Sequence, residues 1–170
     1  MSIGYRTARA ADAPALADMG RRCFAETFGA HFPAADMALH LERKFGSGAL
    51  AREFTDPALT IRMAEAEGEP IAYLKLGPIG LEVPHEPEAR EIRQLYALAP
   101  WQGAGVAASL MDWAVEAARA DGVPALYLSV WEKGDRAIAF YRKHGLETVG
   151  VAPFRLGNTV YQDPVMRLAL

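Results

Sequence analysis

The sequence lacks several features that would indicate particular classes of protein. It has a single cysteine, Cys23, so it can form no intramolecular disulfide and offers no set of thiolates for a zinc site. No uninterrupted apolar run reaches about 18 residues, and residues 1–6 do not have the charged and then apolar layout of a signal peptide. We therefore expect a cytoplasmic protein whose fold rests on packing, with Cys23 as a small buried side chain.

Charge is also nearly balanced. Eighteen basic and 21 acidic side chains give a formal net charge of −3, which disfavours a nucleic-acid partner and suits a cationic one. The four histidines lie in separate segments without the spacing of metal ligands, so we predict no metal site. With 51% apolar residues and no internal repeat, residues 1–170 are expected to form one domain around one core.

Hydrophobic periodicity predicts an α/β protein with a mixed sheet. The strand–helix–strand–helix order after residue 90 requires a right-handed crossover and at least one parallel strand pair. The proline- and glutamate-containing segment Gly77–Arg90 is expected to be an exposed loop. The predicted elements are a strand at Ile3–Ala8, a helix from Asp12 to about Gly29, two short helices separated near Gly46 and Gly48, a hairpin from Thr60 to Leu76, a strand at Glu91–Leu98, a helix at about Gly105–Ala120, a strand at Ala125–Val130, a helix at Asp135–His144 and two final strands to Leu168.

A strand that stops at Pro100 is followed by a turn of small residues that opens a helix, Gln102 to Ala107. Small residues let the main chain approach a ligand closely, and the first N–H groups of a helix can hold a pyrophosphate without a lysine. Glycines in such a turn also have a purely conformational explanation. No Lys-Ser or Lys-Thr follows and there is no G-x-G-x-x-G, which argues against a nucleotide triphosphate or dinucleotide site.

Two ordered blocks carry a resemblance to a known family. Gln102-Gly103-Ala104-Gly105-Val106-Ala107 resembles the Q/R-x-x-G-x-G/A signature of GNAT acetyltransferases, and residues 134–146 resemble that family's N-x-x-A-x-x-F-Y-x-x-x-G-F block. Gly134 replaces the usual asparagine, and Leu146 replaces the usual aromatic residue. The resemblance implies the GNAT fold, with a mostly antiparallel sheet, a splayed parallel pair and flanking helices, and acetyl-CoA as cosubstrate without a metal.

The same resemblance implies which residues bind the cofactor. They lie at the end of the strand, in the turn and on the later helix: Leu95, Tyr96, Ala97, Leu98, Gln102, Gly103, Ala104, Gly105, Val106, Ala107, Ala108, Gly134, Ala137, Phe140, Tyr141 and Lys143.

Two side chains are candidates for proton transfer. By resemblance Tyr141 is the general acid for the departing thiolate; an isolated Phe-Tyr pair on a helix would otherwise suggest a core aromatic. Glu91 heads the strand before the turn and, by period-two alternation, is expected to face the same side as Leu95, where it could act as base. An ion pair with Arg93, or water as the base, are the alternatives. The resemblance also implies that a main-chain N–H on the strand near Leu95 to Ala97 polarises the thioester.

The acceptor is predicted from a finer resemblance to PaiA-like polyamine acetyltransferases. It is carried by residues 26–28, 91–96, 154–157 and 163–166. Four glutamates could attract a polycation, although they would look the same in an ordinary solvated loop: Glu82, Glu86, Glu88 and Glu91. We expect direct acetyl transfer in a ternary complex to a small primary amine, with no nucleic-acid or membrane partner and with a homodimer allowed. The alternatives are a protein N-terminal or lysine acetyltransferase and a non-catalytic CoA-binding regulator.

Overall fold

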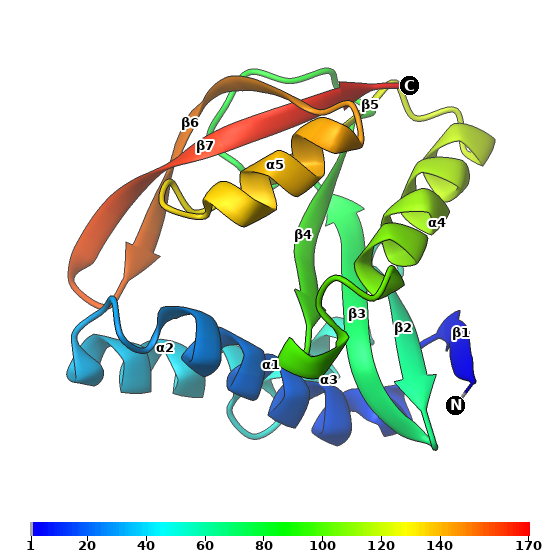
Figure 1. Ribbon diagram of the computed structural model, residues 1–170. Coiled ribbons are helices and arrows are strands. Elements are labelled where there is room, and N and C mark those ends of the chain that lie inside the picture. The colour runs from blue at the N-terminus through cyan, green and yellow to red at the C-terminus, as the bar shows by residue number, and fades with distance from the viewer. Residues whose placement is uncertain (1) are drawn as a thin grey trace.

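One mixed sheet organises residues 2–170, which the computed structural model describes. Its strands are β1 (Ile3–Thr7), β2 (Thr60–Ala66), β3 (Glu69–Pro78), β4 (Arg90–Ala97), β5 (Ala125–Ser129), β6 (Glu147–Leu156) and β7 (Thr159–Ala169). Within these residues the order is β1-β2-β3-β4-β5-β7-β6, and β4–β5 is the one parallel pair (Figure 1). The helices are α1 (Ala13–Phe28), α2 (Ala34–Phe45), α3 (Ala49–Glu53), α4 (Val106–Ala120) and α5 (Asp135–Lys143), with short 3-10 turns η1 (Ala10–Asp12) and η2 (Ala99–Trp101). The predicted mixed α/β class is confirmed.

Helices cover both faces of the sheet because β3 carries apolar side chains on both sides. Leu74 packs in one cluster with Leu110 of α4, whereas its neighbour Tyr73 packs in another with Leu16 of α1. Successive side chains of a strand point to opposite faces, so α1 and α4 lie on opposite sides of the sheet. A fully buried leucine contributes about 1.5–3 kcal/mol, and these two clusters hold the central strands firmly in place.

The strands β4 and β5 separate soon after they meet. Parallel pairing joins only Arg90 with Leu126 and Glu91 with Tyr127 among the described residues, whereas β4 stays paired with β3 as far as Ala97. Along its other edge, the main-chain groups of β4 beyond Glu91 therefore have no strand partner in β5. Such N–H and C=O groups need other partners, which a ligand can provide.

A bulge lies in the middle of β4. Leu76 pairs with Ile92 and Lys75 with Gln94, so Arg93 is the extra residue without a partner on β3. A bulge disrupts the regular alternation of side chains along a strand. The side chains that follow Arg93 therefore point to the opposite face of the sheet from the one that regular alternation would give them.

The segment between β3 and β4 is packed more closely than predicted. Its Ile79, Leu81 and Val83 pack against a buried cluster that contains Tyr127, and the Tyr127 hydroxyl donates a hydrogen bond of 2.6 Å to Glu86. The expectation of an exposed loop is wrong for these side chains. Its proline and glutamate content obscured the apolar residues that alternate between them.

Candidate active site

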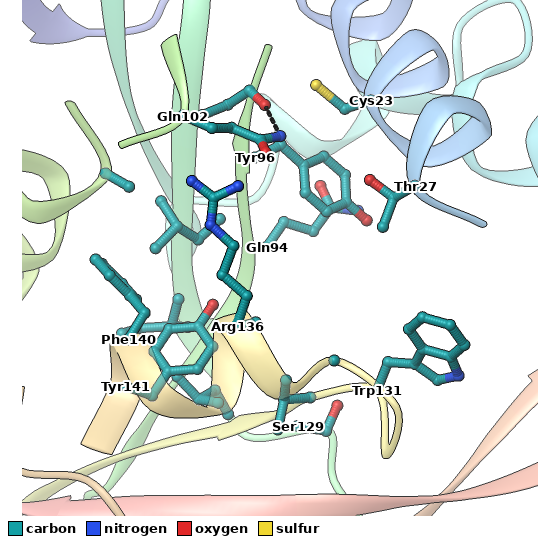
Figure 2. A pocket seen from close by; sticks show the side chains of 18 of the residues that line it. Cys23, Thr27, Gln94, Tyr96, Gln102, Ser129, Trp131, Arg136, Phe140 and Tyr141 are labelled. Carbon is teal, nitrogen blue, oxygen red and sulfur yellow. Dashed lines mark hydrogen bonds between the residues drawn. The ribbon is translucent and has the colours of Figure 1, made fainter. Parts of the chain in front are cut away.

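A cavity of about 820 Å³ opens where β4 and β5 separate. One side of it, which we call the glycine-turn half, is formed by residues 102–108 and by α5; the other, the aromatic half, is formed by α1, Trp131 and the β6–β7 hairpin. Figure 2 shows Tyr141 and Phe140 on one side of this space and Trp131, Thr27 and Cys23 on the other. Main chain of β4 and β5 lies between the two halves.

The glycine turn presents main-chain N–H groups to the cavity. Gly103 and Gly105 have φ values of 80° and 84°, in the left-handed region that favours glycine. Gly105 is the N-cap of the 15-residue helix α4 and no side chain caps the helix there, so its first N–H groups lack intrahelical partners. Ala107 and Ala108 of this first turn line the cavity. The positive end of the helix dipole is thus directed at the cavity.

Two polar side chains flank this turn. Gln102 donates its amide N–H to the Ala97 carbonyl at 3.0 Å, which holds the turn against the end of β4 (Figure 2). Arg136 extends from α5 toward Gln102 in the same view, and a nitrogen of its guanidinium lies 3.4 Å from where a Cβ on Gly103 would be. Among residues 2–170 it forms none of the ion pairs. The turn therefore has a free cation beside its N–H groups.

Sequence reasoning did not identify Arg136. The available signal was a basic residue two positions after Gly134, within the second family block. Gly134 itself sits in a tight position, since a Cβ there would lie 3.1 Å from the Trp131 carbonyl oxygen. An asparagine would require that carbonyl to shift, which gives a physical reason for the departure from the family pattern.

The hydroxyl of Tyr141 points from α5 into the cavity (Figure 2). Its ring packs edge-on against Phe140, with centroids 5.3 Å apart. Burial raises the pKa of Tyr141 to about 12, so the phenol is protonated throughout the neutral range. Tyr141 is therefore both positioned and protonated to donate a hydrogen bond into the cavity.

Most residues implied by the resemblance line this cavity. They are Leu95, Tyr96, Ala97, Gln102, Gly103, Gly105, Ala107, Ala108, Gly134, Ala137, Phe140, Tyr141 and Lys143. Leu98, Ala104 and Val106 do not line it. Val106, the first residue of α4, is fully buried in the core, and Leu98 packs beside the α1 cluster.

Glu91 is not where alternation predicted it. The bulge at Arg93 places Glu91 and Leu95 on opposite faces of β4, because their β3 partners Gly77 and Leu74 point to opposite faces. The carboxylate is 8% exposed, accepts the Gly80 N–H at 2.7 Å and is not part of the cavity wall. Its burial raises the pKa of Glu91. The predicted shared face with Leu95 is therefore wrong.

The aromatic half contains a group of rings that we call the aromatic wall: Phe24, Phe28, Phe32, Trp131 and Phe154. Phe28 lies 5.3 Å from Trp131 and 5.6 Å from Phe32, measured between ring centroids. Rings at these separations attract one another beyond their buried area. The wall is thus a rigid apolar surface that faces the splayed strands.

Cys23 lies in the same half and is buried, as predicted. Burial raises the pKa of its thiol to about 11, so it is a neutral thiol. It behaves as a small wall residue rather than as a nucleophile.

Asp163 of β7 was not predicted as a site residue. Of the cavity-lining residues in the described part of the chain, it is the only aspartate or glutamate. It is 6% exposed, and its Oδ1 is buried without a hydrogen-bond partner within residues 2–170. Burial raises the pKa of Asp163 to about 6, while a hydrogen bond from the Glu132 amide acts in the opposite direction. The sequence signal was faint: an acidic residue directly before the apolar Pro164, Val165 and Met166 of β7.

The four glutamates expected to attract a polycation lie elsewhere. Glu82, Glu86, Glu88 and Glu91 are absent from the cavity wall in the described structure. Glu86 forms an ion pair with Arg167 and accepts the Tyr127 hydroxyl. These contacts, and the Gly80 contact of Glu91, give both carboxylates structural partners.

Comparison with other sequences identifies the family of this chain. Residues 17–146 match the model of the acetyltransferase (GNAT) family. An uncharacterised N-acetyltransferase from the pepI 3′ region of Lactobacillus delbrueckii subsp. lactis is 30% identical over 160 residues, which is 94% of this chain and 92% of that protein.

Solved structures share the fold over nearly the whole chain. The PaiA N-acetyltransferase of Thermoplasma acidophilum in complex with coenzyme A has a TM-score of 0.83 at 18% identity, and both chains are fully covered. The acetyltransferase yncA of Salmonella typhimurium with acetyl-CoA has a TM-score of 0.71 at 16% identity, covering 100% of this chain and 95% of the other. The chain belongs to the GNAT family and is an N-acetyltransferase that uses acetyl-CoA.

Proposed function

We propose that this protein transfers the acetyl group of acetyl-CoA directly to a small primary amine while both substrates are bound. One observation carries the proposal: a single cavity connects the glycine turn with the aromatic wall across the splayed strands. A cofactor on one side and an amine on the other can therefore meet without a covalent enzyme intermediate. Holding two reactants in this way can lower the barrier by about 7–11 kcal/mol.

The glycine-turn half fits the cofactor. The N–H groups of the first turn of α4 would hold the pyrophosphate, with Arg136 as an additional cation. The free edge of β4 from Leu95 to Ala97 would hydrogen-bond the amide groups of the pantetheine arm. Acetyl-CoA supplies an activated thioester at the inner end of this path.

Tyr141 serves as the proton donor in this proposal. The amine nitrogen attacks the carbonyl carbon, a C–N bond forms and the C–S bond breaks, and Tyr141 donates a proton or a strong hydrogen bond to the departing thiolate. A main-chain N–H near Leu95 stabilises the negative charge that develops on the carbonyl oxygen. The attacking nitrogen loses its proton to a base, from the bound ammonium before attack or from the tetrahedral intermediate, so that the product is a neutral amide.

Water is a better-supported base than Glu91. Glu91 has the raised pKa that suits a base, but its carboxylate is bonded to Gly80 and lies outside the wall. Glu91 can serve only through intervening water molecules, so a direct role stays a sequence-based prediction.

A polyamine acceptor is supported by the PaiA-like sequence resemblance rather than by the arrangement of charge. The glutamates that motivated it do not line the cavity. A protein N-terminus or lysine remains the alternative acceptor, and a CoA-binding regulator the alternative without catalysis. A single domain, a homodimer and a cytoplasmic location also stay predictions; no helix within residues 2–170 is long and apolar enough to cross a membrane.

Three measurements on the purified chain test the proposal. Calorimetry with CoA should show saturable binding, and thiol release from acetyl-CoA should require an amine whose acetylated product is identified by mass spectrometry. Initial rates with both substrates varied should give intersecting lines, because parallel lines would indicate a covalent acetyl-enzyme. Binding without transfer to amines or peptides would support the regulator, and absence of CoA binding would overturn the proposal.

A further inference from the structure

The cavity has an uneven distribution of charge that the acetyl-transfer reaction does not by itself explain. Arg136 and Lys143 of α5 and His144 at its C-cap line it, and Arg93 lines it from β4 with its guanidinium bonded to the Pro78 carbonyl. Asp163 is the single acidic side chain on the wall within the described residues. Any cationic acceptor therefore meets one anion in this cavity.

Asp163 belongs to the aromatic half. Pro164 beside it accepts the Val130 N–H at 3.0 Å, which joins β7 to the segment that leads into Trp131. Tyr161, two residues earlier and on the same face of β7, packs 4.9 Å from Phe32 between ring centroids. The carboxylate thus lies among aromatic residues, and the cationic side chains of α5 belong to the other half.

The fold satisfies only part of this carboxylate. The Glu132 amide bonds it, but its Oδ1 is buried and has no hydrogen-bond partner among residues 2–170. A buried carboxylate oxygen without a partner costs free energy. Titratable residues that contact Asp163 or the wall include Glu132, through its amide, His31, whose ring lies 4.8 Å from Trp131, and His40, whose ring lies 5.6 Å from Phe154. Glu132 is acidic, and the buried His40 ring is neutral because burial lowers its pKa to about 4. None of the ion pairs among residues 2–170 includes Asp163, so an external cation is the natural partner.

We propose that Asp163 binds the ammonium group of the acceptor before this nitrogen loses a proton to a base and attacks the thioester, and that the aromatic wall holds its carbon skeleton, so that the acceptor is a small amine with one positive charge on an apolar or aromatic body. The inference rests on the proposed function and names its substrate class. Aromatic faces attract cations as well as apolar groups. The further charges of a polycation would lie near the basic side chains of α5, where the cavity wall has no second carboxylate to pair with them. We therefore expect a polycation to be the weaker substrate.

The first test compares acceptors on the wild-type protein at saturating acetyl-CoA. We expect kcat/KM to be higher for 2-phenylethylamine and hexylamine than for spermidine. Higher kcat/KM for spermidine, or transfer to peptide amines alone, would overturn the inference while leaving the acetyltransferase function in place.

The second test uses Asp163→Asn, with Glu132→Gln as a matched control that removes a neighbouring exposed carboxylate. Asp163→Asn should raise KM for 2-phenylethylamine about tenfold or more, because a hydrogen bond to a charged group contributes about 1.5–3 kcal/mol. The KM for acetyl-CoA and the calorimetric affinity for CoA should not change. Glu132→Gln should leave all three values near those of the wild type.

The outcomes separate the two proposals. If the wild-type protein does not bind CoA, the proposed acetyltransferase function is contradicted. If CoA binds but Asp163→Asn leaves the KM for the amine unchanged, only the present inference is contradicted. If Asp163→Asn fails to fold, Trp131→Leu decides instead: it should raise the KM for 2-phenylethylamine more than the KM for methylamine. Equal effects on both amines would contradict a role of the wall in acceptor binding.

Discussion

The two halves of the cavity are built in different ways. The glycine-turn half comes from two short continuous segments, residues 102–108 and α5, and it offers main-chain N–H groups and basic side chains. The aromatic half gathers single residues from α1, the loop after β5 and the β6–β7 hairpin. It offers rings and one carboxylate, and these residues span most of the length of the chain.

This difference explains why one half has a recognisable motif and the other does not. A main-chain site depends on backbone conformation, so glycines at fixed spacing and a helix start are enough to reveal it. A side-chain site depends on which residues tertiary packing brings together, and their spacing in the sequence carries little information. Four predictions test the roles proposed for residues in the two halves.

Removing the Tyr141 hydroxyl should have the largest effect. Tyr141→Phe should lower kcat about 100-fold or more, since general acid catalysis typically contributes about 10²–10⁴-fold, and should leave the CoA dissociation constant unchanged. Stopped assays of thiol release and calorimetry measure the two quantities. Tyr5→Phe, at an exposed position on β1, is the control and should match the wild type. Parallel losses of rate and CoA affinity would instead indicate a packing role.

Arg136→Gln should change only the affinity for the cofactor. We expect the CoA dissociation constant to rise about tenfold, or about 1.4 kcal/mol, through loss of a charge-assisted contact with phosphate. The loss should shrink as salt rises, because exposed charges are screened over about 10 Å at 0.1 M.

Arg142→Gln provides the charge-matched control. Arg142 is exposed on the same helix but does not line the cavity. Equal weakening by both variants would show that net charge, rather than the position of Arg136, determines CoA binding.

Gly105 and Gly122 offer a matched pair for the turn. Both have positive φ, 84° and 70°, and a Cβ would meet no atom within 4 Å at either position. Gly105→Ala and Gly122→Ala should therefore each lower the free energy of unfolding by about 1–2 kcal/mol through the same backbone strain. Only Gly105→Ala should also weaken CoA binding in calorimetry. Equal CoA affinities in the two variants would mean that the turn is conformational rather than functional.

The smallest effect should be a gain in stability from Asp163→Asn. The variant removes a buried charge, so we expect the free energy of unfolding to rise by about 1 kcal/mol, or roughly 2–4 °C in Tm. The pKa of Asp163 in the folded state is about 6, above the ordinary value of 3.8, so the folded protein binds this proton more tightly than the unfolded chain.

The pH dependence has a definite sign. The cost of the buried charge is fully present above pH 6 and disappears as the pH falls toward about 4. Thermal unfolding of the two proteins should therefore differ at pH 7.5 and converge near pH 4. A destabilised variant at pH 7.5 would show that Asp163 has a structural partner.

The sequence predicted the sheet class, the order of the elements and many of the residues that line the cavity. It misplaced Glu91 because a single extra residue, Arg93, reverses the alternation of β4, and nothing in local composition marks that bulge. It also described the segment before β4 as exposed, since prolines and glutamates outweighed the apolar Ile79, Leu81 and Val83.

By itself the sequence determined the features that depend on neighbouring residues: the positive-φ glycines at 103 and 105, the start of α4 and the position of Tyr141 on α5. Only the tertiary structure decided the separation of β4 from β5, the reach of Arg136 to the turn and the burial of Asp163 among aromatic residues. The physical reason is the range of the interactions. Backbone conformation and helix capping act over a few residues, whereas burial and packing join residues from distant parts of the chain.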